Sequence, residues 1–211
     1  MSDEYVLPRK ATLESPLRLA VMISGGGSGL QALLKHQGCG DRAHVTALVI
    51  ADTETAGGLS HAMDAGVDFV SVPLPQGLKG HERRRAHEEH IMRCLVSKDI
   101  ELVVLSGYMR ILSSYFVSHW KGRLVNIHPS LLPDFPGAHA QRDALEAGVR
   151  VSGCTVHFVD EGVDSGPVIE QREVPVLDSD TVDTLRDRIK EAEHDLYPKI
   201  LDDISLGRIS L

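Results

Sequence analysis

The order of strand-like and helix-like segments is the feature of this sequence that most limits its fold. Between residues 19 and 128, short apolar runs of strand length alternate with segments whose apolar residues recur at helical spacing. Strands are expected at residues 19–23, 45–51, 69–72, 102–105 and 123–128, and helices after residue 29, within 53–66, at 81–98 and at 113–120. An alternating order of this kind predicts a parallel sheet covered by helices on both faces.

The pattern changes after residue 128. Two further strand-like segments, 151–159 and 168–176, flank a turn-rich stretch and predict an antiparallel pair at the later edge of the sheet, followed by a long helix at 181–206. The fold class is therefore α/β: a single open, mostly parallel, twisted sheet with helices on both faces and an antiparallel strand pair near the C-terminal half. We expect residues 1–17 to form a disordered or loosely ordered tail and residues 18–211 to form one domain.

Composition argues against several classes of protein. The chain has 211 residues and a formal net charge of -8, and its only short basic run is Arg83–Arg85, so no nucleic-acid partner is expected. No apolar run reaches the ~20 residues that cross a bilayer, and the acidic N-terminus lacks a signal core, so no membrane partner and a cytoplasmic location are expected. The three cysteines fit neither a disulfide framework nor a zinc site, and we expect no metal.

A glycine-rich turn at residues 24–29 joins the first strand to the first helix. Glycine lets the backbone approach a ligand, and the start of a helix offers free N–H groups to a phosphate. No Gly-Lys-Ser/Thr follows, so the turn is not a P-loop, and Leu30 replaces the third glycine of the dinucleotide motif. The turn indicates anion binding at Gly27, Ser28 and Gly29; a tight turn without a ligand is the alternative.

Two polar residues end the fifth strand. Asn126 and His128 lie on one face because side chains alternate along a strand, and the carboxyl ends of parallel strands are where ligands bind. They indicate a reactive site, although two satisfied core groups remain the alternative. For Asp164, in a glycine-rich loop before Pro167, the residues alone slightly favour a solvated turn carboxylate. Arg110 follows the strand at 102–105, where it could hold an anion, and a surface arginine is the alternative.

Four segments at these places closely resemble the phosphoribosylglycinamide formyltransferase family, folate-dependent enzymes of purine synthesis. The segments are Ile23–Gln31, Gly107–Leu112, Asn126–Pro133 and Val163–Ile169, in the order and at the spacing of that family. The resemblance extends over residues 18–208. It implies transfer of a formyl group from 10-formyltetrahydrofolate, the co-substrate, to the amine of 5'-phosphoribosylglycinamide, without a metal.

The resemblance also implies roles for individual residues. The catalytic residues are Asn126, His128 and Asp164. The phosphate and ribose of the substrate bind at Gly27, Ser28, Gly29, Lys190, Glu191, Ala192 and Glu193, with Glu193 as the direct contact. The folate binds at Arg84, Met109, Arg110, Ile111, Leu112, Asp160, Glu161, Gly162 and Val163. Many members carry asparagine where this chain has Gly26 and Gly29, which removes two amides at ~1 kcal/mol per lost hydrogen bond.

The implied chemistry is direct attack of the amine on the formyl carbon. Asn126 and protonated His128 would donate hydrogen bonds to the oxyanion, and Asp164 would stabilise the imidazolium. The alternatives are methionyl-tRNA formyltransferase and formyltetrahydrofolate hydrolase, which normally carry a further domain for which we expect no room in 211 residues. A silent nucleotide-binding module would have no use for the three catalytic residues together. We expect small-molecule substrates only and a monomer or homodimer.

Overall fold

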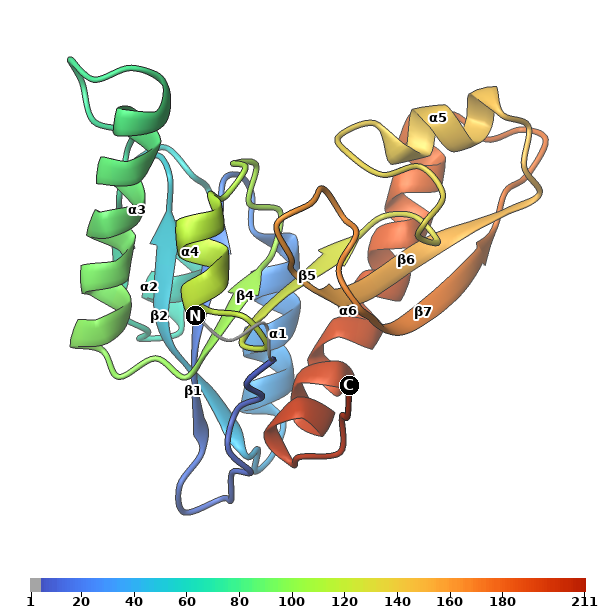
Figure 1. Ribbon diagram of the computed structural model, residues 1–211. Helices are drawn as coiled ribbons and strands as arrows, with labels where there is room; N and C mark the ends of the chain where they lie inside the picture. Colours follow the sequence, from blue (N-terminus) through green and yellow to red (C-terminus); the bar gives the residue numbers. More distant parts are fainter. Residues whose placement is uncertain (1–4) are drawn as a thin grey trace.

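The computed structural model describes residues 5–211 and contains every strand and helix that the sequence predicts (Figure 1). The elements are β1 (Leu17–Ile23), α1 (Ser28–Gly38), β2 (His44–Ala51), α2 (Leu59–Asp64), β3 (Phe69–Ser71), α3 (Gly80–Ser97), β4 (Leu102–Leu105), α4 (Ser114–His119), β5 (Leu124–His128), α5 (Ala140–Glu146), β6 (Val151–Phe158), β7 (Val168–Pro175) and α6 (Val182–Ser205). The short helix α5 is not among the predicted elements.

The strands form one sheet in the order β3-β2-β1-β4-β5-β6-β7. The first five strands are parallel, whereas β6 is antiparallel to both β5 and β7, which confirms the predicted fold class. The chain leaves β1 toward β2 on one side and reaches β4 on the other. This reversal opens a crevice at the carboxyl ends of β1 and β4, where α/β sheets bind their ligands.

Alternation along β1 separates two hydrophobic clusters. Leu19, Val21 and Ile23 pack toward α1 and α6, and Ala20 and Met22 pack toward α3 and α4 on the opposite face. All five side chains are fully buried. A central parallel strand that is apolar on both sides is stable only between two layers of helices, which is the arrangement in Figure 1.

Helix α6 closes one side of the crevice. It begins at the N-cap Thr181, whose side chain accepts a hydrogen bond from the backbone N–H of Thr184. Further along, the buried Tyr197 hydroxyl lies 3.1 Å from the carbonyl oxygen of Leu105 and 3.0 Å from that of Val125. The helix is thereby held against the ends of β4 and β5. Neither α6 nor any other helix within residues 5–211 is long and apolar enough to cross a membrane.

The N-terminal segment differs from the loose tail expected for residues 1–17. Residues 1–4 lie outside the described residues, but from residue 5 onward the segment packs on the domain without a helix or strand before β1. Ala11 is 1% exposed and donates its N–H to Ser205 O at 2.8 Å, and the Tyr5 ring meets that of Phe158 edge-on. The apolar residues scattered among polar ones anchor the segment, because they cover the cluster beneath it.

Candidate active site

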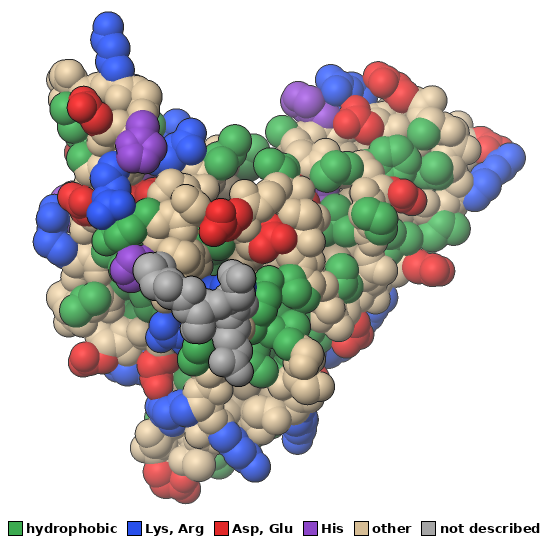
Figure 2. Space-filling view, in the orientation of Figure 1, with side chains coloured by type: hydrophobic (Ala, Val, Ile, Leu, Met, Phe, Trp, Pro, Cys, Tyr) green, Lys and Arg blue, Asp and Glu red, His purple; other side chains and the backbone are tan. Residues whose placement is uncertain are grey.

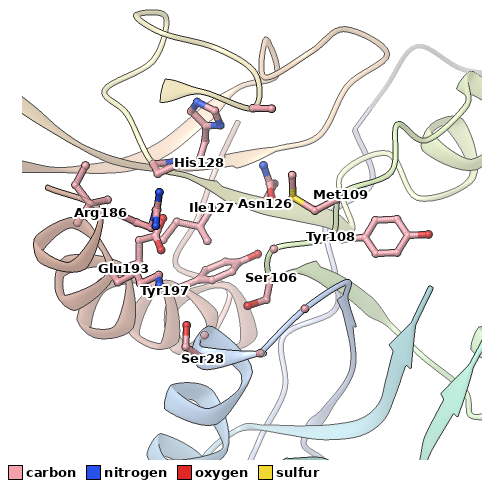
Figure 3. Close-up of a pocket in the computed structure, with 18 of the residues that line it drawn as sticks. Ser28, Ser106, Tyr108, Met109, Asn126, Ile127, His128, Arg186, Glu193 and Tyr197 are labelled. Carbon is pink, nitrogen blue, oxygen red and sulfur yellow. The ribbon is translucent and has the colours of Figure 1, made fainter. Parts of the chain in front are cut away.

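A cavity of about 640 Å³ lies at the carboxyl ends of β1, β4 and β5, between the start of α1 and one face of α6 (Figure 3). It is lined by Gly25–Gly29, Ser106–Ile111, Asn126–Pro129, Gly137, Ala138, Gln141, Asp164, Arg186, Ile189, Lys190, Glu193, His194 and Tyr197. Residues predicted from three separate motifs therefore share one cavity.

The glycine-rich turn forms one end of this cavity. Gly27 has a left-handed conformation with φ 67°, and a Cβ on it would lie 2.7 Å from Gly58 Cα, so only glycine fits there. No side chain caps the start of α1. The N–H groups at the start of α1 therefore have no side-chain partner and lie beside the cavity, next to the Ser28 hydroxyl and the His194 ring 3.2 Å from it.

The structure brings Asn126, His128 and Asp164 together at the opposite end. Asp164 Oδ2 lies 3.2 Å from His128 Nδ1 and accepts the Gly137 N–H at 2.9 Å. His128 Nε2 lies 2.9 Å from Phe135 O. Both neighbours of the imidazole are hydrogen-bond acceptors, an arrangement that a doubly protonated ring satisfies on both sides. Asp164 has a left-handed φ of 52°, which aspartate and asparagine tolerate better than most residues.

His157 is a member of this group that the sequence analysis missed. It pairs with Asn126 across the β5–β6 ladder, and its Nε2 lies 3.2 Å from Asn126 Nδ2 while its Nδ1 lies 3.0 Å from Phe158 O. Burial lowers the pKa of His157, which favours a neutral ring that donates through Nδ1 and accepts through Nε2. The ring therefore fixes the orientation of the Asn126 amide, with Nδ2 turned toward His157 Nε2.

Only part of the predicted segment 190–193 reaches the cavity. Lys190 and Glu193 line it, because residues three apart share a helix face, whereas Glu191 is exposed and Ala192 packs against the core. Burial raises the pKa of Glu193 to about 7, and nearby Lys190 opposes the shift. Arg186, one turn earlier, also lines the cavity and was not predicted.

The residues predicted for folate line smaller adjoining cavities. One of about 130 Å³ contains Arg110, Ile111, Leu112, Asp160, Gly162 and Val163 together with Asn126, His157 and Asp164. Another of about 340 Å³ contains Arg84 and Met109–Leu112. Glu161 is exposed and lines none of these cavities. Met109 and Ile111 are each 67% exposed, and the surface is hollowed between the α3 and α5 ends of the molecule (Figure 2).

The segment 107–113 is held in place by buried polar groups. The Glu88 carboxylate is 1% exposed and accepts the Ser113 N–H at 2.6 Å, together with the Ser113 hydroxyl. Arg110 forms an ion pair of 2.5 Å with Asp52, which follows β2. Arg110 was predicted to hold an anion, and the structure gives it an internal carboxylate partner.

A second polar cluster lies away from the crevice. His36, His44 and Asp202 place their ligand-type atoms within 4.8 Å of one another. The Arg42 guanidinium lies 3.6 Å from the same carboxylate, and Gln37 Nε2 faces His44 Nδ1 at 2.8 Å, which leaves the proton on the His44 nitrogen that faces Asp202. These contacts describe an ion-pair cluster, and the expected absence of a metal stays a prediction.

The fold and this crevice define an α/β enzyme whose ligand site lies at the carboxyl ends of the strands. The model of the formyl transferase family matches residues 17–201, and the chain belongs to that family.

Three individual proteins show the similarity in more detail. Phosphoribosylglycinamide formyltransferase of Escherichia coli is 37% identical over 195 residues, covering 92% of this chain and 90% of that protein. The crystal structure of glycinamide ribonucleotide transformylase 1 from Symbiobacterium toebii matches with a TM-score of 0.87 at 43% identity, covering 93% of this chain and 91% of that one. The trifunctional purine biosynthetic protein adenosine-3 of Drosophila melanogaster is 46% identical over 87% of this chain, which spans only 14% of that protein.

Proposed function

We propose that this chain transfers the formyl group of 10-formyltetrahydrofolate to the amine of 5'-phosphoribosylglycinamide, giving the N-formyl product and tetrahydrofolate. The observation that carries the proposal is that a phosphate-type site and a carboxylate–imidazole–amide group occupy opposite ends of one cavity. A substrate with a phosphate at one end and an amine at the other fits this division. The names of the relatives support the same substrate.

Each end of the phosphorylated substrate has partners in the cavity. The start of α1, with Ser28 and Lys190, supplies donors and positive charge for the phosphate. Glu193 lies between the two ends and is suited to the ribose hydroxyls, because a carboxylate accepts hydrogen bonds. The folate is proposed to enter past Met109–Leu112 and to place its ring beside Asp160–Asp164.

The reaction requires one new bond and one broken bond. The substrate amine attacks the formyl carbon, the formyl oxygen becomes an oxyanion, and collapse of this intermediate breaks the bond to the folate nitrogen. The amine loses one proton and the folate nitrogen gains one, so His128 or a water it contacts is needed to move a proton. Asn126 donates an N–H to the oxyanion, and its orientation is set by His157.

His128 is not free to act in the conformation described. Its Nε2 donates to Phe135 O, so donation to a substrate requires that this hydrogen bond be exchanged. Asp164 keeps its contact with Nδ1 during the exchange and stabilises the imidazolium. The carboxylate thus has a role throughout the cycle, as the sequence resemblance implies.

The proposal is tested by a coupled absorbance assay with both substrates, with formate plus ATP as a control for an ATP-dependent route. Transfer that depends on 10-formyltetrahydrofolate and the phosphorylated amine is expected. Release of formate without the amine would instead identify a hydrolase, and transfer only to an aminoacyl-tRNA would identify a tRNA formyltransferase.

The same proposal extends to the partners, cellular location and oligomeric state of the enzyme. Free small-molecule substrates need neither nucleic acid nor membrane, and we propose a cytoplasmic monomer or homodimer. Sedimentation of the purified chain with and without substrates decides between the two assemblies.

A further inference from the structure

The Ser106 hydroxyl occupies the space that a side chain at position 29 would need, beside the start of α1. Ser106 follows β4, and Gly29 is the second residue of α1. A Cβ placed on Gly29 would overlap the Ser106 hydroxyl oxygen. By contrast, a Cβ on Gly26, in the same turn, would meet no atom within 4 Å. Of these two positions in the turn, position 26 therefore faces open space, whereas the space beside position 29 is filled by a serine hydroxyl.

The Ser106 hydroxyl is available to a ligand. It lines the main cavity, and Figure 3 shows it pointing toward Ser28 and the start of α1. Among residues 5–211 it has no hydrogen-bond partner, although its backbone N–H is bound to Met22 O. An accessible hydroxyl beside unpaired helix N–H groups adds a donor where an anion is favoured.

We propose that the Ser106 hydroxyl donates a hydrogen bond to the substrate phosphate in place of the side chain that Gly29 lacks. The inference rests on the proposed function, since it assigns one more contact to the same substrate. With the Ser106 hydroxyl in this rotamer, position 29 has no room for a Cβ, so a side chain at 29 requires the hydroxyl to rotate away or position 106 to carry a smaller residue. The two positions therefore form a coupled pair that determines how the phosphate is held.

The first test is Ser106→Ala, with Ser97→Ala as a matched control on the exposed end of α3. KM for the phosphorylated amine is expected to rise about 10-fold, the usual effect of one hydrogen bond to a charged group, with kcat within about twofold of wild type. With the dephosphorylated amine, Ser106→Ala and wild type should behave alike. An unchanged KM, or equal losses with both amines, would overturn the inference, because the hydroxyl would then touch no phosphate.

The second test uses coupling between positions. In Gly29→Asn the Ser106 hydroxyl must rotate out of this volume, so adding Ser106→Ala should change KM by less than about threefold, against about 10-fold in the wild-type background. Gly26→Asn with Ser106→Ala should instead show additive effects, since position 26 is open. Additive behaviour in the Gly29 pair would contradict the proposal.

Inorganic phosphate separates this inference from the proposed function. Its dissociation constant, measured by calorimetry on wild type and Ser106→Ala, should rise about 10-fold in the variant. If the wild type binds phosphate in this manner but transfers no formyl group, the proposed function fails and the Ser106 contact stands. If transfer is normal and phosphate binding ignores Ser106, only the Ser106 contact fails.

Discussion

Replacing Asn126 by alanine separates binding from chemistry at the proposed reaction centre. The Asn126 amide carries two N–H groups, and one of them points to His157 Nε2 at 3.2 Å. The neutral His157 ring accepts this bond because its other nitrogen faces Phe158 O at 3.0 Å. The second N–H is left for the cavity, so the substitution removes one donor to the oxyanion.

Two effects of different size follow from this geometry. Loss of one oxyanion donor lowers turnover by roughly 10²–10³-fold, equivalent to ~3–4 kcal/mol in the barrier. Loss of the donor to His157 leaves one acceptor unpaired beside a cavity that water can enter, which costs at most ~1 kcal/mol of stability. The effect on turnover should therefore far exceed the effect on folding.

The assay measures kcat and KM for both substrates in Asn126→Ala and in Asn126→Asp. Aspartate keeps the shape but cannot donate when ionised, so it should be at least as inactive as alanine. Urea unfolding of the wild type and of both variants measures their stability and provides the control for folding. Wild-type turnover combined with a raised KM would refute the assignment, because Asn126 would then hold the ground state.

Three further predictions concern charge, pH and backbone. Asp164→Asn keeps the left-handed turn but removes the charge 3.2 Å from His128, so turnover should fall about 10²-fold with little change in the unfolding midpoint; equal turnover would mean that the charge has no role. Burial lowers the pKa of His44, so below pH ~6.5 the unfolded chain binds more protons than the folded chain and the free energy of unfolding decreases as pH falls. His44→Asn should flatten this slope in urea titrations between pH 7 and 5, and an unchanged slope would exclude His44 as a source. Gly27→Ala should destabilise the fold by about 2–4 kcal/mol, from the left-handed φ and the overlap with Gly58, and a change below ~0.5 kcal/mol in urea unfolding would show that the turn relaxes freely.

Periodicity was sufficient to predict the sheet. The strands are apolar, short and separated by helices with one buried face, so element type and order follow from the residues themselves. Helix α5 escaped prediction because it is only seven residues long and buries two small residues, Ala140 and Ala144, which give little apolar signal. The packing of residues 5–16 on the domain was not predicted, because the residues that anchor this segment have no period.

The sequence predicted residues that share one cavity, but it did not predict the contacts that hold them in place. Strand alternation and the carboxyl-end rule place Asn126 and His128 beside the glycine-rich turn, and the resemblance adds Asp164. The contacts of His157 with Asn126 and of Glu88 with Ser113 join residues 31 and 25 positions apart. Such contacts depend on register between elements, and a pattern within one element carries no information about them.

Ser106 and Gly29 show how a departure from a family pattern depends on a second position. Taken alone, Gly29 removes a polar side chain and predicts weaker phosphate binding. The Ser106 hydroxyl occupies the volume which that side chain would enter, so the contact proposed for Ser106 offsets the donor that Gly29 lacks. Gly26 has no such neighbour, so its missing amide is not replaced by the same means. Against a chain with a side-chain amide at both positions, the expected net loss of phosphate contacts is therefore one hydrogen bond and not two.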